Sequence, residues 1–306
     1  MKQLIQIADR EIRITGGRLS IAKIDAELYR FVSSPEPILA GLRILPHRPD
    51  IFTFTQSLAD TTPHYSYRME WDNLAVIPVT TFEHWWEKQI SSVPRNRMRQ
   101  AGKRGVVLRE APFNEDLVRG ICKIYNETPV RQGRPFPHFG KDYETVYRDE
   151  ATFLDSAVFI GAYLGDELIG FVKLVMDENR NQAGMMNILS MIQHRDKAPN
   201  NALVAESVRV CADRAISNLF YWRFAHGKRD RDSVSDFKTN CGFKRVDLPR
   251  YYVPLTAWGE VALRLGLHHR FVDRLPESVG EKLRELRSRW YNRKNRTGTA
   301  MAQVSS

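Results

Sequence analysis

The sequence lacks the features that would place it in a membrane or in an oxidising compartment. Among its 306 residues there is no run of about 18 uncharged apolar residues, which a membrane-spanning helix requires. The first ten residues contain no apolar core of the kind that a secretory signal peptide carries. Three cysteines, Cys122, Cys211 and Cys241, show no metal-ligand spacing and cannot all pair as disulfides. We therefore expect a cytoplasmic protein with no transmembrane segment and no bound metal.

The composition is that of a globular protein with a basic surface. Hydrophobic residues make up 42% of the chain and charged residues 27%, and the length suits one large domain or two small ones. The formal net charge is +10. Such a balance favours polyanionic partners, among them a nucleotide cofactor, a phosphate-bearing substrate, RNA or an anionic membrane surface.

Positive charge is concentrated in two segments. Between positions 95 and 109 there is no acidic residue, and the bases are Arg95, Arg97, Arg99, Lys103, Arg104 and Arg109. Bases also outnumber acids in residues 257–306, where apolar spacing predicts a helix over 277–296. Each segment is either a solvated face or a contact for a polyanion. The tail helix would also suit peripheral contact with an anionic membrane.

We expect three regions along the chain. Residues 1–92 form an N-terminal α/β subdomain of short strands, residues 93–256 a domain of alternating strands and helices, and residues 257–306 a basic helical tail. The elements with the clearest patterns are a helix over 114–125 capped by Asn114, a hairpin of strands 158–164 and 167–175, a strand over 183–192, and a helix over 201–215. Further strands are expected at 65–71, 218–225, 243–247 and 251–255.

The segment from Asp236 to Phe243 predicts a short helix that ends at a glycine and is followed at once by a strand. A helix commonly ends on a residue in the left-handed conformation, and glycine adopts that conformation at the lowest cost. Gly242 would be that residue.

This order of elements resembles the GNAT superfamily of acyltransferases. The matching pieces are Val158–Tyr163 with Glu167–Val172, then Asn187–Ile192, and finally Asn240–Phe243, and the resemblance covers about residues 106–255. It implies an α/β (α+β) fold with a mixed, mostly antiparallel sheet flanked by helices.

Two details resemble the FemAB-like branch of that superfamily. They are the basic segment 95–106 and the pair Phe237-Lys238 shortly before Gly242-Phe243. The branch transfers amino acids from aminoacyl-tRNA to peptidoglycan precursors, and some of its relatives use acyl-coenzyme A. Its members carry two GNAT-like halves, so residues 1–92 would be a reduced N-terminal half.

The resemblance also implies where a donor would lie. The backbone amides of Leu189, Ser190 and Met191 would hold the acyl carbonyl, as the third strand does in GNAT enzymes. The usual glycine-containing pyrophosphate loop is replaced by the glycine-free segment 194–202. Amides at a helix N-terminus still bind phosphate, and the residues that would assist are Arg195, Lys197, Asn200 and Asn201. We expect acetyl-CoA or another acyl-CoA as the donor, with aminoacyl-tRNA as the alternative.

Acyl transfer to an amine needs a polarised carbonyl, a base and an aligned acceptor. Lys238 would stabilise the oxyanion or the leaving group, and otherwise is a solvated lysine. For the base the candidates are Glu127, His138, Asp236 and His194. Arg131 and Arg134, in the loop 126–140, would clamp a carboxylate or phosphate of the acceptor. The other substrate-binding candidates are Lys173, Tyr221 and Tyr251. Lys173 would face the sheet or the site, depending on the register of its strand. Tyr221 and Tyr251 are equally plausible as core or rim aromatics.

Two functions from different classes remain open. The first is an N-acyltransferase whose acceptor is an amine of a small molecule or of a cell-envelope precursor. The second is a non-catalytic protein that binds nucleic acid or an anionic surface on the same scaffold, through phosphate contacts that weaken steeply with salt.

Overall fold

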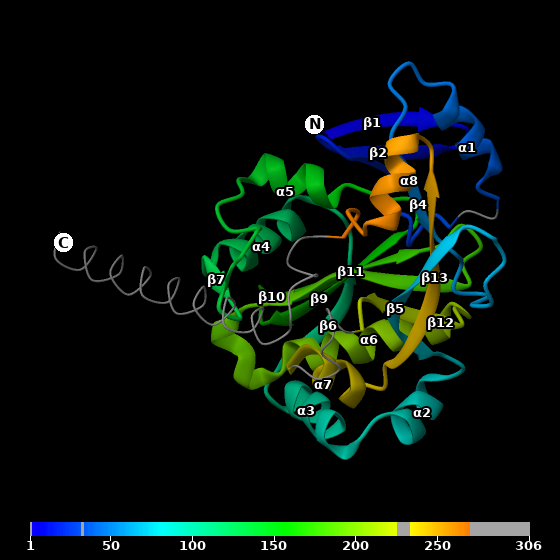
Figure 1. Cartoon of the computed structure of the whole chain (residues 1–306). Coiled ribbons are helices and arrows are strands. Elements are labelled where there is room, and N and C mark those ends of the chain that lie inside the picture. The colour runs from blue at the N-terminus through cyan, green and yellow to red at the C-terminus, as the bar shows by residue number, and fades with distance from the viewer. Residues whose placement is uncertain (1, 32–33, 225–232, 270–306) are drawn as a thin grey trace. The chain divides into compact units, whose positions relative to one another are not determined.

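The structure is a computed structural model that describes residues 2–31, 34–224 and 233–269 (Figure 1). The chain divides into two compact units. Unit one contains the described parts of 2–91, 175–186 and 208–269, and unit two contains 92–174 and 187–207. The expected domain boundaries after residues 92 and 256 remain a prediction, as does the reduced N-terminal half. The predicted tail helix over 277–296 lies outside the described residues.

Unit one is built on a mostly antiparallel sheet. Its strands are β1 (Lys2–Ile7), β2 (Arg10–Gly16), β3 (Ser20–Ile24), β4 (Ile51–Thr55), β5 (Arg68–Pro78), β12 (Asn218–Trp222), β13 (Lys244–Pro254) and the first part of β11 (Gln182–Ser190). They follow the order β1-β2-β3-β4-β13-β5-β12-β11. The pairs β3–β4 and β11–β12 are parallel, and the other pairs are antiparallel.

The helical elements of unit one are α1 (Glu36–Arg43), α2 (Phe82–His84), the π-helix η1 (Trp85–Gln89), α7 (Ser233–Asn240) and α8 (Ala257–Arg264). Of these, α1 and α8 contribute residues to apolar clusters. The main core joins Ile38, Leu39 and Leu42 of α1 to apolar residues of the strands, among them Phe52 and Phe54. Alternation along these strands directs one set of side chains to this core.

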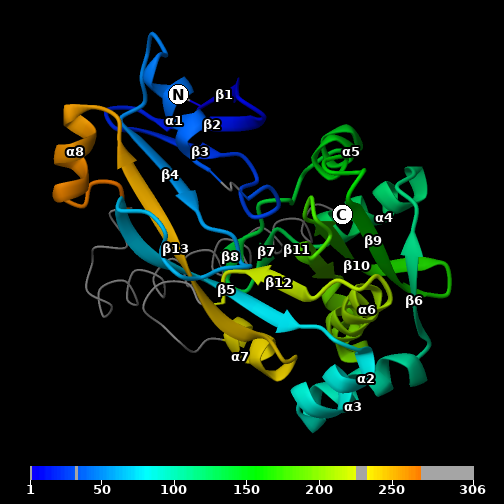
Figure 2. The same ribbon diagram turned by 90° about the vertical axis from the view of Figure 1, so that its right-hand side faces the viewer.

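Strand β13 differs from the prediction of two short strands. It is one continuous strand, and it lies between β4 and β5 (Figure 2). Pro249 lies between the two predicted strands, and a proline has no amide hydrogen to donate to a ladder. The β5 ladder nevertheless runs past it, with Pro249 opposite Trp71. The strand predicted over 65–71 likewise begins later, at Arg68, and continues to Pro78.

Unit two holds the second set of strands in the order β11-β10-β9-β6. Its elements are α3 (Ser92–Lys103), β6 (Val106–Ala111), α4 (Glu115–Asn126), β7 (Val130–Arg131), β8 (Arg134–Pro135), α5 (Tyr143–Glu150), β9 (Ala157–Leu164), β10 (Glu167–Met176), the 3₁₀ helix η2 (Ile192–Lys197) and α6 (Pro199–Asp213). The ends of β10 and α6 belong to unit one. The predicted hairpin is confirmed, since β9 and β10 turn at Gly165–Asp166.

Helix α4 shows how local sequence builds unit two. The Asn114 side chain accepts a hydrogen bond from the Leu117 amide at 3.0 Å, which confirms the predicted cap. The apolar stripe that includes Leu117, Ile121 and Ile124 is buried in the unit-two core. Helix α5 lies beside α4 (Figure 1).

The predicted fold class is confirmed as a mixed, mostly antiparallel sheet combined with helices. None of the helices in the described part of the chain has the length and apolar character that crossing a bilayer demands.

Candidate functional site

The first feature of the candidate site is the point along β11 at which its pairing with β12 ends. Its parallel ladder with β12 contains three pairs, from Gln182–Asn218 to Gly184–Phe220. The strand itself continues to Ser190. Burial changes along it: residues 182–185 are buried, whereas 186–190 are half-buried. The peptide groups that the resemblance assigns to the acyl carbonyl, at Leu189 and Ser190, therefore lie in the half-buried part. Met191, by contrast, is buried, and its amide donates to the Ile169 carbonyl at 2.8 Å.

Arg131 ties the end of this strand to α4. Its guanidinium donates to the Ser190 carbonyl at 2.8 Å and to the Ile124 carbonyl at 2.7 Å. It also lies 4.6 Å from the centre of the Phe136 ring. Burial is the main reason that the pKa of Arg131 is lowered, and Glu127 opposes that effect. Since its donors already hold backbone carbonyls, the geometry suits positioning of β11 better than clamping a substrate.

Glu127, the residue that follows α4, holds the start of η2. Its two carboxylate oxygens accept hydrogen bonds from the amides of Ile192 at 2.7 Å and Gln193 at 2.9 Å. An ion pair with Arg131 at 3.2 Å completes this set, and both side chains are mostly buried. The carboxylate is therefore engaged by three donors, which fixes the chain just beyond β11.

The loop predicted to be functional is a small hairpin. Strands β7 and β8 pair Val130 with Pro135 and Arg131 with Arg134. Arg134 is exposed, unlike Arg131. His138, further along, is half-buried with its ring 4.4 Å from that of Tyr125. Burial, followed by the charge of Lys141, lowers the pKa of His138, so its imidazole is neutral at pH 7.

A buried polar cluster lies behind this hairpin, and sequence reasoning missed most of it. Glu150 is 1% exposed, and its carboxylate accepts hydrogen bonds from the Tyr125 hydroxyl at 2.7 Å and from Nδ2 of the Asn187 side chain at 2.9 Å. Lys173, predicted as a substrate residue, is fully buried and donates to the Glu150 carbonyl at 2.7 Å. Its position indicates a structural link between β10 and α5.

The glycine-free segment forms a 3₁₀ helix in place of a glycine-rich loop. Helix η2 ends at Lys197, the next residue Ala198 has a left-handed backbone, and α6 then begins at Pro199. Proline is tolerated at a first helical position because that amide has no partner in the helix. The Ala198 carbonyl accepts from the amides of Asn201 and Ala202 at 3.1 and 3.3 Å.

The side chains of this segment differ in how they are engaged. Arg195 is exposed, and Lys197 lies 3.4 Å from Asp196. His194 lies 3.5 Å from Glu167. Asn201 is 7% exposed, and the Asn200 side-chain oxygen is buried with no hydrogen-bond partner among the described residues.

In unit one, α7 ends as the sequence predicts. Gly242 has a φ of +88°, and the amides of Gly242 and Phe243 donate to the carbonyls of Thr239 and Lys238 at 3.0 Å each. Lys238 is only 1% exposed: its ammonium lies 4.3 Å from the centre of the Tyr221 ring and donates to the Arg223 carbonyl. Lys238 is therefore not a solvated lysine, and the structure brings it together with the predicted Tyr221.

The remaining predicted residues of unit one are separate from that pair. Asp236 is exposed in the first turn of α7. Tyr251 is completely buried in the core, where its hydroxyl donates to Gln56 at 2.9 Å and accepts from the His64 amide at 2.9 Å. The environment of Tyr251 supports a packing role.

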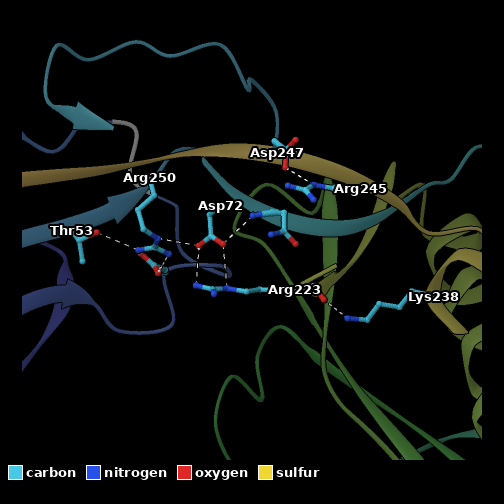
Figure 3. Close-up of polar contacts among 9 residues, drawn as sticks. Thr53, Asp72, Arg223, Lys238, Arg245, Asp247 and Arg250 are labelled. Carbon is cyan, nitrogen blue, oxygen red and sulfur yellow. Dashed lines mark hydrogen bonds and ion pairs between the residues drawn. The ribbon is translucent and has the colours of Figure 1, made fainter. Parts of the chain in front are cut away.

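An ion-pair network at the middle of unit one was not predicted. Asp72 lies between Arg250, at 3.1 Å, and Arg223, at 3.2 Å (Figure 3). Arg250 also pairs with Glu27 at 2.6 Å. Burial alone would lower the pKa of Arg250, but the carboxylates of Glu27 and Asp72 raise it. The signal available in the sequence was that Asp72 and Arg250 each lie within a strand. A charged residue in such a place indicates a buried partner, but the sequence does not say which residue that partner is.

These elements define a GNAT-like fold, and the predicted resemblance is confirmed at the level of the fold. The solved structures that are similar to this chain include the following three. The C-terminal domain of a protein described as a lysylphosphatidylglycerol synthetase, from Agrobacterium fabrum, is 13% identical with a TM-score of 0.55, covering 87% of this chain and 86% of that one. L-PGS from Bacillus licheniformis is 11% identical with a TM-score of 0.56, covering 86% and 88%. FemX is 10% identical with a TM-score of 0.57, covering 87% and 90%.

At these identities the likeness shows a shared fold. No protein-family model and no curated protein sequence matches the chain.

Proposed function

We propose that this chain is an acyltransferase that moves an acyl or aminoacyl group to an amine acceptor. The observation that carries the proposal is the short β11–β12 ladder, which ends at Gly184 while β11 continues to Ser190. In the GNAT superfamily that the sequence resembles, amides of this strand hold the acyl carbonyl. Amides aimed in advance at a developing oxyanion stabilise it without reorganisation.

The contacts around Ser190 support such a preorganised strand end. Arg131 holds the Ser190 carbonyl, and Glu127 holds the two amides that follow Met191. We assign both residues to positioning, because their polar atoms are already engaged. His138 is the better candidate for the general base, since a neutral imidazole accepts a proton at pH 7.

Lys238 supplies the cationic group of the proposed reaction. It would donate a hydrogen bond to the oxyanion or to the leaving group, as the resemblance to the Phe-Lys pair implies. Its buried contact with the Tyr221 ring orients the ammonium and reduces its access to water. Arg134, which is exposed on the hairpin, would bind a carboxylate or phosphate of the acceptor.

The donor in this proposal is an acyl-coenzyme A, with aminoacyl-tRNA as the alternative. Arg195 and Lys197 lie beside the start of α6, where phosphates would bind. The similar structure described as a lysylphosphatidylglycerol synthetase supports testing a lysyl donor and a lipid acceptor. The resemblance to the FemAB-like branch adds a cell-envelope precursor as an acceptor to test.

A donor panel tests the proposal. The purified full chain is incubated with acetyl-CoA, longer acyl-CoAs or charged tRNA, together with a set of amines. Thiol release, or loss of the aminoacyl ester, reports transfer. We expect transfer from one donor class, and a rise in Tm with that donor that persists at high salt. Absence of transfer and of a Tm shift with every donor would contradict the proposal.

A second function, binding of a polyanion, is favoured by the positive charge on the surface of α3. Its bases Arg97, Arg99 and Lys103 are exposed, and the helix contains no acidic residue. A non-catalytic polyanion-binding protein would use this face. It would give a Tm shift with heparin that disappears at high salt and no shift with coenzyme A.

A further inference from the structure

We propose that unit one contains a binding site for a single divalent transition-metal ion of the zinc class, formed by Glu70, His268 and His269. The donor atoms of these three side chains all lie within 4.8 Å of one another. One oxygen of Glu70 lies 3.0 Å from Nε2 of His268 and 3.2 Å from Nε2 of His269. The proposal is independent of the transferase function, because none of these residues has a part in it.

The two distances match the spacing of ligands around a small tetrahedral ion. Zinc binds imidazole nitrogen and carboxylate oxygen at about 2.0–2.2 Å, so neighbouring ligands of a tetrahedral site lie about 3.3 Å apart. The Glu70–His268 and Glu70–His269 distances are close to that edge length. Two of the three ligand spacings therefore already suit such an ion, and binding would move the imidazole protons away from Nε2. Nδ1 of His268 has no hydrogen-bond partner among the described residues, so it is able to carry that ring's proton.

The backbone that presents the two histidines is a well-defined helix end. At the end of α8, the amides of Leu267 and Gly266 donate to the carbonyls of Ala262 at 2.7 Å and Leu263 at 3.1 Å, and Gly266 has a φ of +66°. This is the bonding of a glycine-terminated helix. Leu267 packs against the cluster of Ile51, Ala262 and Leu263. The two histidines therefore follow directly from a fixed turn.

The third ligand comes from the middle of the sheet. Glu70 lies on β5 opposite Arg250 of β13, and β13 also supplies Tyr252, whose ring lies 4.6 Å from that of His268. The His268 side chain is 1% exposed, whereas Glu70 and His269 are 30% and 39% exposed. The arrangement is thus closed on the His268 side and accessible to solvent on the other. Three protein ligands with one accessible side leave room for a water ligand.

The ligand types select a class of ion. Two imidazoles and one carboxylate suit Zn²⁺, Co²⁺ or Ni²⁺, whereas Mg²⁺ and Ca²⁺ prefer a set made of oxygen atoms. The sequence predicted no metal because the cysteines lack ligand spacing. The two adjacent histidines meet Glu70 only through the fold, because 198 positions of sequence separate Glu70 from His268.

Calorimetry with the full-length, tag-free and chelator-treated protein tests this proposal. We expect one Zn²⁺ to bind per chain. Bound Zn²⁺ should raise the Tm of the protein by mass action. Co²⁺ in the same site should give the visible absorption of a four-coordinate ion. Glu70→Gln keeps the hydrogen-bonding shape, and His269→Asn changes the most exposed ligand. Each should weaken Zn²⁺ binding by at least about tenfold, since loss of even an outer-shell partner costs about 10–100-fold.

His64→Asn is the matched control. His64 pairs with Asp60 at 2.8 Å in the same unit, but no third ligand joins them within the part of the chain that the structure describes. This variant should bind Zn²⁺ as the parent protein does. The proposal is overturned if the parent binds no Zn²⁺ stoichiometrically, or if binding survives unchanged in both folded variants. Either result would leave Glu70 as a carboxylate that accepts two ordinary histidine hydrogen bonds.

Discussion

Lys173 donates a hydrogen bond from its buried ammonium to the backbone carbonyl of Glu150, at 2.7 Å. The Glu150 carboxylate lies further away, at 3.9 Å, and accepts from Tyr125 and Asn187 instead. Burial lowers the pKa of Lys173 to about 8, although Glu150 partly opposes this. A cation in this position joins β10 to the end of α5 and makes the stability of the protein depend on pH.

Stability should rise with pH between about 8 and the ordinary lysine value of 10.5. In that window the unfolded chain holds the Lys173 proton and the folded protein does not, so raising the pH favours the folded state. Below about pH 8 both states hold the proton, and the contribution is constant. Urea unfolding across this pH range should show the free energy of unfolding rising with pH in the parent protein. The same rise is expected in Lys123→Met, an exposed control on α4, and its absence is expected in Lys173→Met. A Lys173→Met variant with the same slope as the parent would contradict the assignment.

Arg131→Lys should lower both Tm and turnover. Lysine cannot hold the Ser190 and Ile124 carbonyls together with one planar group, and losing such charged hydrogen bonds costs about 2 kcal/mol. Thermal unfolding and steady-state kinetics check this. The comparison is Arg134→Lys on the same hairpin, which should leave Tm unchanged and raise KM for the acceptor. Equal Tm values for the two variants would rule out the positioning role of Arg131.

Lys238→Met should lower kcat by about a hundredfold, the usual effect of removing one donor to an oxyanion. Methionine preserves most of the packing against Tyr221, so the fold should be retained. Circular dichroism and turnover are measured together. Lys244→Met, at an exposed position on β13, should behave as the parent does. Unchanged turnover in Lys238→Met would remove this residue from the mechanism.

Asp72→Asn should destabilise unit one strongly. The change leaves Arg250, which is 9% exposed, without one of its two carboxylate partners, and breaking a buried pair costs about 3–5 kcal/mol. Asp247→Asn is the matched control. Asp247 pairs with Arg245 (Figure 3), and the two side chains are 46% and 42% exposed. Such a pair contributes less than about 1 kcal/mol. Chemical denaturation that finds similar losses for both variants would refute the role of the network.

His138 should set the acidic limb of the pH profile for kcat/KM. Because burial and Lys141 lower the pKa of His138, the neutral base persists below the usual histidine range. Activity should fall only when the pH drops below about 6.5. A His138→Gln variant should lose most activity and also this limb. If the limb remains in the variant, another group is the base.

Several local features were predictable from the sequence alone. Asn114 caps α4, Gly242 ends α7 in the left-handed conformation, and the hairpin turns at Gly165–Asp166. These features depend on residues a few positions apart, whose preferences are set by backbone sterics and local hydrogen bonds. Their order along the chain was enough to indicate the fold class and the resemblance that the similar structures confirm at the level of the fold.

Only the tertiary structure decided which polar side chains meet. It pairs Asp72 with Arg250, Lys173 with Glu150, and Glu70 with His268. It also buries Tyr251 completely in the core. These partners are far apart in sequence, and their contacts depend on strand register and packing. A local pattern contains no information about either, because the same strand can pair in several registers until the whole core selects one.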